Sequence, residues 1–337
     1  MRWWHDLLRT NITSGQSSVC LFPIFARCGQ TPNRYRVGYI NDGGCLVVPA
    51  EFDDGLPFSE GLAAVALCGK WGYIDAFGMF EIPVHLDSGS YFVESRSSFL
   101  KGRHRGFIDR SGSVIAQARY DTVGSFSEGF AWVEVNERHG FVSLAGEDLG
   151  PFVYENAREF SQGLASVKIN AKWGYIDPSG NFAIPPRFDG LVAGPFRNGL
   201  ARVSIGGRWG YIDQSGSFAI EPQFDMAYDF SEGLAQIELS GLDGYVDRDG
   251  HLVIPSAFSF TNPFSEGLAA VSVNGLKGFI DQAGLWVIPA RFTATGRFRN
   301  GLCLVTTAQE IGYINRAGEF VWGGPFVETS LGYDLRF

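Results

Sequence analysis

The motif Lys-Trp-Gly-Tyr-Ile-Asp occurs at residues 70–75 and again at 172–177, and Arg-Trp-Gly-Tyr-Ile-Asp occurs at 208–213. Successive equivalents of its glycine, here the landmark glycine, are 34 residues apart, except for one interval of 36. A fixed period over nine copies predicts a stacked array, because so short a unit cannot bury a sufficient core alone. The landmark glycines are Gly38, Gly72, Gly106, Gly140, Gly174, Gly210, Gly244, Gly278 and Gly312.

Other positions recur around each landmark glycine. An aromatic residue always follows it, then Ile or Val, and a further glycine lies six residues after it. The two additional residues of the long interval fall in segment 189–196, where they lengthen one loop and leave the frame intact. Fourteen residues before the landmark the first copy has Ile24, and the others have phenylalanine: Phe58, Phe92, Phe126, Phe160, Phe196, Phe230, Phe264 and Phe298.

Each unit is predicted to contain three short strands, exemplified by residues 62–67, 71–75 and 218–220. The second strand has adjacent aromatic and aliphatic residues, which predicts cover on both faces, and its glycine indicates a close approach by another group. An Asp-x-x-Gly turn follows the second strand. We interpret its aspartate as a turn former, not as a catalytic acid or calcium ligand: Asp75, Asp109, Asp177, Asp213, Asp247 and Asp281.

The motif Lys-Trp-Gly-Tyr-Ile-Asp, with Phe-Ser-Glu-Gly-Leu-Ala upstream, resembles the WG-repeat (KWG) family of β-rich repeats, which is found mostly in bacterial proteins. The resemblance covers residues 24–326 and implies an all-β array used for binding, with no catalytic residues to transfer. Tryptophan precedes the landmark glycine only at Trp71, Trp173 and Trp209. Segments 1–23 and 327–337 are interpreted as atypical terminal segments or caps.

The expected array has about nine three-stranded units and forms an open solenoid or superhelix. A closed ring of β-propeller type is the alternative. Propeller blades usually contain four strands and at least about 40 residues, whereas this unit has room for three strands.

Composition restricts the location and the partners. The net charge of −9 argues against nonspecific binding to nucleic acid or anionic membranes by the whole molecule. Five cysteines without Cys-x-x-Cys spacing are interpreted as reduced thiols. No stretch has the roughly 18 apolar residues of a membrane helix, and the N-terminus does not resemble a signal peptide. We therefore expect a cytoplasmic protein that does not contact a membrane.

Enzymatic motifs are not found. There is no Gly-x-Ser-x-Gly elbow and no phosphate-binding P-loop. His104 and His139 occupy variable positions beside the landmark glycine, where we expect exposed strand ends. We expect a non-enzymatic protein without a metal or cofactor; an enzyme would need a reactive cluster assembled across repeats.

The glutamate of the Ser-Glu-Gly motif has two interpretations. It either accepts hydrogen bonds within its loop, or contributes to an acidic track for a basic partner. Arg197 and Arg299 would interrupt that track. The position holds Glu60, Glu94, Glu128, Glu232 and Glu266, and in other copies Gln162, Asn198 and Asn300.

The repeat is disrupted in the Gly106 copy, where Phe-Ser-Glu-Gly-Leu-Ala-Ala-Val becomes Phe-Val-Glu-Ser-Arg-Ser-Ser-Phe. Between residues 96 and 119 the local charge is positive although the chain is acidic, which predicts a site for a phosphate, a nucleic acid or an acidic protein face. A charge-protected strand edge is the alternative. The candidate binding residues of this segment are Arg96, Lys101, Arg103, His104, Arg105, Arg110 and Arg119.

Trp132 is a second candidate binding residue. We place it at an outward strand position, where an exposed indole can stack on a sugar or anchor a partner. Packing against a neighbouring loop is the other interpretation. The leading functional hypothesis is a non-enzymatic scaffold that binds another protein. The alternative is a receptor for a small or polymeric ligand, either an anionic nucleotide or nucleic acid at the basic segment or a carbohydrate at exposed aromatic residues.

Overall fold

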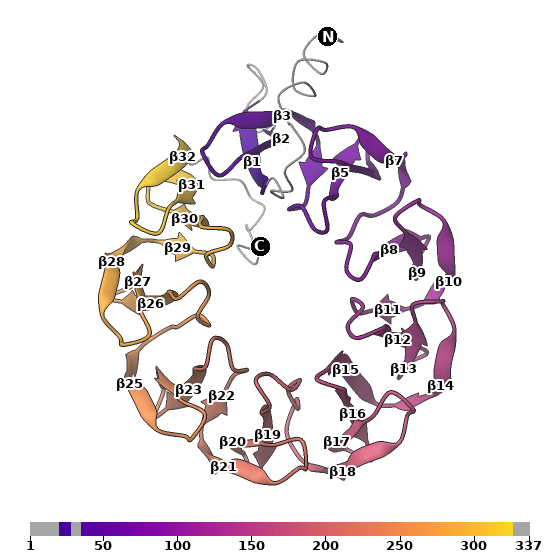
Figure 1. Ribbon diagram of the computed structural model, residues 1–337, viewed down its shortest axis with the longest axis vertical. Helices are drawn as coiled ribbons and strands as arrows, with labels where there is room; N and C mark the ends of the chain where they lie inside the picture. Colours follow the sequence, from indigo (N-terminus) through magenta and orange to yellow (C-terminus); the bar gives the residue numbers. More distant parts are fainter. Residues whose placement is uncertain (1–19, 28–34, 326–337) are drawn as a thin grey trace, which may run out of the picture. The chain divides into compact units, whose positions relative to one another are not determined.

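The computed structural model describes residues 20–27 and 35–325. The chain divides into two compact units, Met1–Ala118 and Arg119–Phe337. All regular structure in the described residues is β-strand (Figure 1), and none of these residues forms a helix long and apolar enough to cross a membrane. Residues 1–19 and 326–337, which include most of the predicted N-terminal segment and the whole predicted tail, lie outside the described residues.

The first unit has three antiparallel sheets among its described residues. Their strands are β1 (Phe22–Arg27), β2 (Tyr35–Ile40) and β3 (Leu46–Phe52); β4 (Asp54–Gly55), β5 (Ala63–Leu67), β6 (Lys70–Ile74) and β7 (Phe80–Leu86); and β8 (Arg96–Lys101), β9 (His104–Asp109) and β10 (Val114–Tyr120), in which the unit ends.

The second unit has six sheets among its described residues. Their strands are β11 (Thr122–Val123), β12 (Phe130–Val135), β13 (Arg138–Ser143) and β14 (Asp148–Tyr154); β15 (Asn156–Ser161), β16 (Leu164–Ile169), β17 (Lys172–Ile176) and β18 (Phe182–Phe188); β19 (Ala201–Ile205), β20 (Arg208–Ile212) and β21 (Phe218–Phe224); β22 (Met226–Ala227), β23 (Ala235–Leu239), β24 (Leu242–Val246) and β25 (Leu252–Phe258); β26 (Ala269–Val273), β27 (Leu276–Ile280) and β28 (Trp286–Phe292); and β29 (Ala294–Thr295), β30 (Cys303–Thr306), β31 (Glu310–Ile314) and β32 (Phe320–Pro325).

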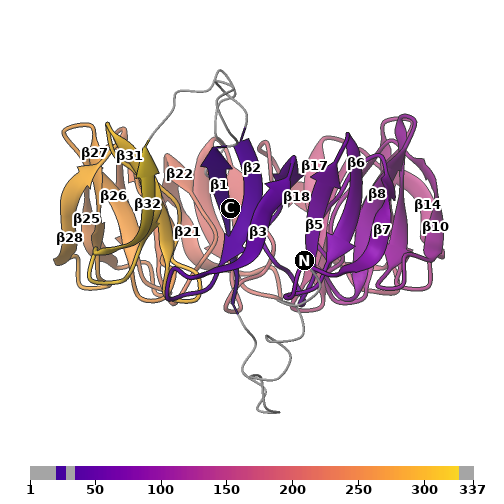
Figure 2. The ribbon, with the colours of Figure 1, turned by 90° about the horizontal axis from the view of Figure 1, so that it is seen from above.

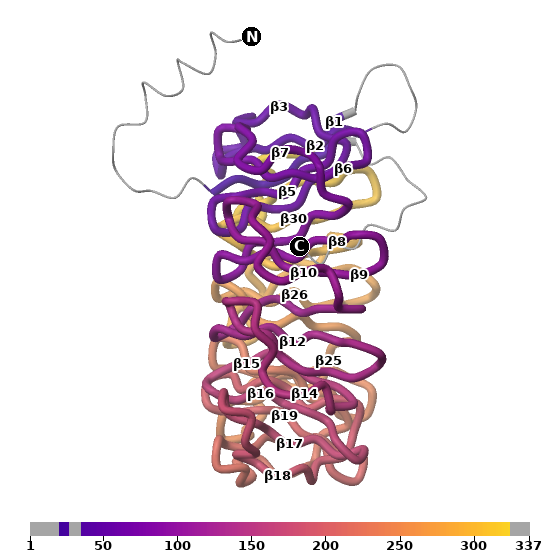
Figure 3. The backbone as a smooth tube through the Cα atoms, turned by 90° about the vertical axis from the view of Figure 1, so that its right-hand side faces the viewer, coloured from indigo at the N-terminus to yellow at the C-terminus, as the bar shows by residue number. Residues whose placement is uncertain are grey.

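Each sheet is an up-and-down meander whose strands follow chain order. In the second unit the long final strands, such as β21 and β28, lie on the convex side, and the short first strands face the concave side (Figure 1). Hairpins and turns gather at the two ends of the strands (Figures 2 and 3). Where the next sheet begins with an additional short strand, the final strand continues directly into it, as β21 does into β22 across Asp225.

The prediction of three strands per unit was incomplete, because five of the nine described sheets have a fourth strand. The additional strand comes first in its sheet. In most of these sheets it is only two residues long, which is too short to show a periodic pattern in sequence. The open-solenoid prediction was also wrong for these sheets: each repeat forms a separate meander, as in the alternative of propeller-type blades.

The landmark glycine has a steric role within its own sheet. Gly278 of β27 lies opposite Val271 of β26, and a Cβ on it would lie 2.5 Å from the carbonyl oxygen of Ile288 in β28. Gly210 has the same 2.5 Å relation to the Ile220 oxygen. The predicted close approach is confirmed, and the approaching group is the backbone of the final strand of the same sheet.

The core lies between successive sheets. Tyr211 and Ile212 of β20 are both fully buried, which confirms that the second strand of the motif is covered on both faces. Tyr211 packs with Phe230 and Ile237 of the next repeat, and its hydroxyl donates to the Tyr228 carbonyl at 2.7 Å. The aromatic position after the landmark glycine therefore joins neighbouring repeats by both apolar contact and a buried hydrogen bond.

Candidate functional site

Hydrogen bonds of the Ser-Glu-Gly motif join successive loops. In the Gly244 repeat, Ser231 Oγ donates to the Phe264 carbonyl at 2.7 Å, and the Glu232 carboxylate accepts from the backbone N–H groups of Glu266 (2.7 Å) and Gly267 (2.8 Å). We call this arrangement the Ser–Glu clasp. Its serine bond is repeated by Ser59, Ser127, Ser161 and Ser265, each to the phenylalanine carbonyl of the next repeat.

The clasp resolves the two interpretations of the repeated glutamate. Its carboxylate accepts backbone hydrogen bonds, as the structural interpretation proposed, but from the next repeat rather than from its own loop. Glu128 binds the N–H groups of Gln162 and Gly163 in the same way, at 2.6 and 2.7 Å. Since these oxygens are already engaged by the protein, the acidic track is the weaker interpretation.

The clasp is interrupted between the Gly210 and Gly244 repeats, where Arg197 and Asn198 replace the serine and glutamate. Arg197 turns back to the preceding repeat, donating to Ser161 Oγ at 3.3 Å and pairing with Glu159 at 3.6 Å. Within the described part of the chain, neither replacement side chain bonds to loop 230–233. This interface therefore lacks the Ser–Glu clasp that joins the loops of the Gly244 and Gly278 repeats.

A cavity of about 580 Å³ lies around loop 228–231 in the second unit. Its walls come from four consecutive repeats, those of Gly210, Gly244, Gly278 and Gly312. The size is within the range of about 300–1,000 Å³ typical of small-molecule sites. The residues that decide its chemistry are Arg197, Arg202, Tyr228, Asp229, Asp243 and Arg297.

An ion pair between Arg202 of β19 and Asp229 forms one wall, with 2.8 Å between Nε and Oδ1. Arg202 also donates from Nη1 to the Ala227 carbonyl at 2.9 Å, and its guanidinium lies 5.6 Å from the Trp209 ring centroid and 5.7 Å from that of Tyr228. Burial raises the pKa of Asp229, although Arg202 and Arg197 oppose this change. The arginine is thus held by a carboxylate, a carbonyl and two rings.

The lengthened loop of segment 189–196 makes room for this pair. A Cβ on Gly194 would lie 2.6 Å from both Arg202 Cγ and Asp229 Oδ1. The two-residue insertion recognised in the sequence is therefore located beside the cavity, a placement that the sequence analysis did not anticipate.

A second wall is a connected polar group. Gln236 donates from Nε2 to the carbonyl and to Oγ1 of Thr261, both at 2.7 Å, and the Thr261 hydroxyl donates to Asp243 Oδ2 at 3.1 Å. Burial raises the pKa of Asp243. These hydrogen bonds fix the polar wall before any ligand is present.

Arg297 contributes the remaining charge. It is exposed, and among residues 20–27 and 35–325 it has no acidic partner or hydrogen bond. Burial of part of its side chain, followed by repulsion from Arg299, lowers its pKa, although a guanidinium remains charged at neutral pH. Its donors are available to a molecule in the cavity.

Sequence comparison places the chain in a family. The profile of the WG containing repeat matches residues 38–71, 106–138, 151–173, 173–209, 209–242, 244–276 and 278–307, which together exceed half of the chain. The chain belongs to the WG-repeat family. This finding confirms the resemblance drawn from the motif. No curated protein sequence matches the chain significantly.

One solved structure shares the fold of these WG repeats. A eukaryotic initiation factor matches with a TM-score of 0.64 at 11% identity, over 91% of this chain and 96% of that one. Dihydro-heme d1 dehydrogenase NirN matches with a TM-score of 0.49 at 12% identity, over 94% and 76%. Hsv2p of Kluyveromyces lactis matches with a TM-score of 0.43 at 10% identity, over 65% and 89%. The initiation factor shows a likeness of fold alone.

The predicted basic segment does not form one cluster. Lys101 lies opposite His104 in the strand register, at the hairpin end of β8 and β9, and Arg103 Nε lies 3.3 Å from His104 Nε2. Arg96 lies opposite Asp109 in the strand register, at the other end of the same hairpin, and Arg105 lies opposite Leu100 within it. The strand register therefore separates the candidates, and their binding role stays a prediction.

Two other basic residues of that segment have structural partners. Arg110 donates from Nη1 to the Glu60 carbonyl at 2.6 Å, and Gln214 and Gln282 make the equivalent contact in later WG repeats. Arg119, which belongs to the second unit, pairs with Asp148 at 2.8 Å and lies 5.0 Å from the Tyr120 ring centroid. Both positions serve the fold.

The outward placement of Trp132 was wrong. Its ring is half-buried, packs against Gly124 and against a core cluster that Phe141 forms with residues of the following sheet, and lies 5.6 Å from the His139 ring. The equivalent side chains Ala64, Ser166, Gln236, Ala270 and Leu304 are buried. This position faces the neighbouring loop because the sheets pack face to face. Packing, the second interpretation of Trp132, agrees with the structure.

His139 beside it is also half-buried, not the exposed strand end that we expected, and burial lowers its pKa. His104 is partly buried as well.

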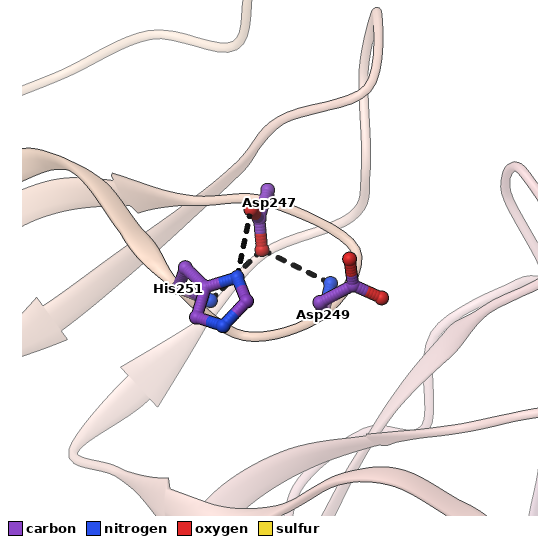
Figure 4. Close-up of side chains that lie close together, drawn as sticks. All are labelled: Asp247, Asp249 and His251. Carbon is purple, nitrogen blue, oxygen red and sulfur yellow. Dashed lines mark hydrogen bonds and ion pairs between the residues drawn. The ribbon is translucent and has the colours of Figure 1, made fainter.

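The turn aspartates have the predicted structural role. Asp213 Oδ1 accepts from the N–H groups of Ser215 and Ser217 at 2.9 and 3.0 Å. In the Gly244 repeat the same turn brings Asp247, Asp249 and His251 within 4.8 Å of one another (Figure 4), with His251 Nδ1 3.2 Å from Asp247 Oδ2. Asp247 Oδ1 accepts from the other two backbone N–H groups, so this exposed cluster is explained by the turn.

Exposed apolar residues occur at the start of the final strand in many WG repeats. In the second unit they are concentrated on two strands: Leu252 and Val253 on β25, and Leu285, Trp286 and Val287 at the start of β28. This pattern was not predicted, because an apolar residue at a strand end is also compatible with burial. The exposed apolar residue that recurs in these repeats lies eight residues after the landmark glycine. It is Leu46, Phe80, Val114, Phe182, Leu252, Trp286 or Phe320.

Proposed function

We propose that this WG-repeat protein is a non-catalytic scaffold that binds another protein along the edge of β28 and the neighbouring β25. The observation that carries the proposal is the apolar edge made by Leu285, Trp286 and Val287, whose exposed fractions are 66%, 44% and 43%. Consecutive exposed apolar residues of this kind are typical of contact sites for a partner.

The backbone of β28 supports the same proposal. This strand is the last of its three-stranded sheet, so one of its edges has no neighbour among the described strands. An extended apolar segment of a partner can add to such an edge through main-chain hydrogen bonds, and Trp286 can anchor it. The proposed occupant is therefore an extended apolar peptide segment rather than a polyanion.

We also propose that the sheets are blades of a β-propeller. Their sequential meanders and short first strands support it. Small-angle scattering should give a radius of gyration near the compact value of about 20 Å. A markedly larger radius would contradict the closed propeller.

The partner proposal is tested by native mass spectrometry of the tagged protein recovered from its own cells. We expect a second polypeptide at defined stoichiometry with the wild type, and its loss with the double variant Leu285→Asp/Val287→Asp. Leu191→Asp is the matched control, because Leu191 is 90% exposed on a different loop of the second unit. A polypeptide that binds both variants equally would contradict the proposed edge.

A further inference from the structure

Departures from the repeat converge on the cavity around loop 228–231. Arg197 and Asn198 replace the Ser–Glu pair, and the insertion in segment 189–196 brings Gly194 against the ion pair. Arg202 occupies a position that holds alanine or serine in four other copies, and Asp229 one that holds proline in four. Positions where a repeat abandons its own structural rule are candidates for function.

The loss of the clasp has a physical consequence. A serine at position 197 would be expected to bond to the Phe230 carbonyl, and a glutamate at 198 to the N–H groups of Glu232 and Gly233, by analogy with Ser231 and Glu232. The actual residues instead point away or remain unbonded to that loop. The cavity lies where these bonds are missing.

The charges of the cavity favour an anion. Asp229 is paired with Arg202, whereas Asp243 accepts the Thr261 hydroxyl, a hydrogen bond that leaves the negative charge of Asp243 in place. Arg197 is paired with Glu159 across a longer distance of 3.6 Å, and Arg297 has no acidic partner among the residues described. The lining includes three arginines, Arg197, Arg202 and Arg297, against two aspartates, Asp229 and Asp243, so its formal charge is +1.

Rings complete the lining. The Tyr228 side chain is 39% exposed, although its other face is held by Arg202, and Phe260 lies under the Lys277 ammonium at 3.9 Å. Both rings belong to the cavity wall and offer a flat surface to a ring or carbon skeleton. An amphiphilic anion matches this combination better than a bare inorganic ion or an uncharged sugar.

We propose that this cavity binds a small organic anion, a carboxylate or phosphate ester whose charged group contacts Arg297 and whose ring or carbon body lies against Tyr228. Guanidinium groups bind both kinds of anion through paired N–H donors. The site lies within the second unit, and it does not depend on the protein-binding edge of β28.

Matched pairs of probes test the proposal on the full chain. Adenosine monophosphate and adenosine differ in one phosphate, and benzoate and benzyl alcohol differ in one carboxylate. Isothermal titration and ligand-observed NMR should detect binding of at least one anion and markedly weaker binding of its neutral counterpart. The two pairs distinguish a phosphate from a carboxylate ligand. Binding of neither anion, or equal binding of both members of each pair, would overturn the proposal.

Variants assign the binding to this cavity. Arg297→Ala should weaken binding of the anion at least about tenfold, as loss of a charged hydrogen bond usually does. Arg138 is an exposed arginine on a distant hairpin, and Arg138→Ala should leave the affinity unchanged. Arg197→Ser/Asn198→Glu should rebuild the clasp and also abolish binding while thermal stability is retained. An affinity unchanged by both Arg297→Ala and the rebuilt clasp would place the ligand elsewhere and contradict the assignment.

Discussion

Two neighbouring loop interfaces of the second unit differ although the frame beneath them is the same. Between the Gly244 and Gly278 repeats, Ser231 and Glu232 make three hydrogen bonds to the next loop. Between the Gly210 and Gly244 repeats, Arg197 contacts the preceding repeat and a cavity adjoins the interface. In both, the tyrosine after the landmark glycine donates to a carbonyl 17 residues later, Tyr211 to Tyr228 and Tyr245 to Asn262.

The difference separates two tasks within one repeat. The landmark glycine and the buried tyrosine determine how the strands and sheets pack, so they are retained at both interfaces. The loop bonds are near the surface and individually modest, about 1 kcal/mol for a typical hydrogen bond. One clasp can therefore be lost without loss of the fold, which leaves that position available for binding.

The largest effect is expected from changes to the shared frame. Gly278→Ala and Gly210→Ala should each destabilise the protein by about 3 kcal/mol, because the added methyl group meets backbone that cannot move without breaking the sheet. Urea denaturation measures this loss. Gly43→Ala is the control, since its Cβ would come no nearer than 3.4 Å to Asn41 Oδ1. If the protein tolerated Gly278→Ala but not Gly210→Ala, the two interfaces would not share one frame.

A smaller loss is expected when an intact clasp is removed. Glu232→Ala deletes the acceptor of two backbone N–H groups and should reduce the free energy of unfolding by about 2 kcal/mol. Glutamate and alanine both have a Cβ, so the left-handed backbone of position 232 (φ 52°) affects the wild type and the variant similarly. Glu221→Ala, at an exposed strand position, should change stability by less than about 0.5 kcal/mol. Equal effects of the two substitutions would show that the clasp contributes nothing.

Rebuilding the missing clasp should stabilise the protein slightly. Arg197→Ser/Asn198→Glu should gain about 1 kcal/mol, less than a full clasp contributes, because Arg197 loses its contacts with Ser161 and Glu159. Chemical denaturation in low and high salt separates the lost ion pair from the new bonds. A net destabilisation at both salt concentrations would mean that loop 230–233 cannot accept the clasp.

The smallest effect is a difference in pH dependence between two aspartates. The pKa of Asp229 is raised by burial, so its contribution to stability is present below the unfolded-state pKa and is lost as pH rises through the folded-state value. The pKa of Asp213 is lowered, first by the Ser215 hydroxyl, so its contribution is present at neutral pH and is lost as pH falls. Arg202, Arg197 and Glu159 are the charged groups that act on Asp229.

Denaturation between about pH 3 and pH 7 tests these signs. The wild type should lose stability relative to Asp229→Asn as pH rises, and should gain stability relative to Asp213→Asn over the same range. Slopes of the same sign for the two variants would contradict the assignment.

The period, the strand frame and the turn chemistry could all be predicted from the order of the amino acids. Each depends on groups close together in the chain, as when Asp213 binds the backbone of Ser215 and Ser217, and such local patterns can be read from one copy and checked in eight others. The positions of the repeated serine and glutamate were also visible, but not their partners.

The contacts between repeats could not be predicted in this way and became visible in the folded protein. The Glu232 carboxylate finds its backbone N–H donors 34 and 35 residues later, and the walls of the cavity extend from Arg197 to Arg297. Which side chains face one another at such separations depends on how the sheets pack. The repeat period shows which residues are equivalent in successive copies, but not the direction in which their side chains point. For the same reason Trp132 was placed outward, and the short fourth strand, created by pairing with the next repeat, was missed.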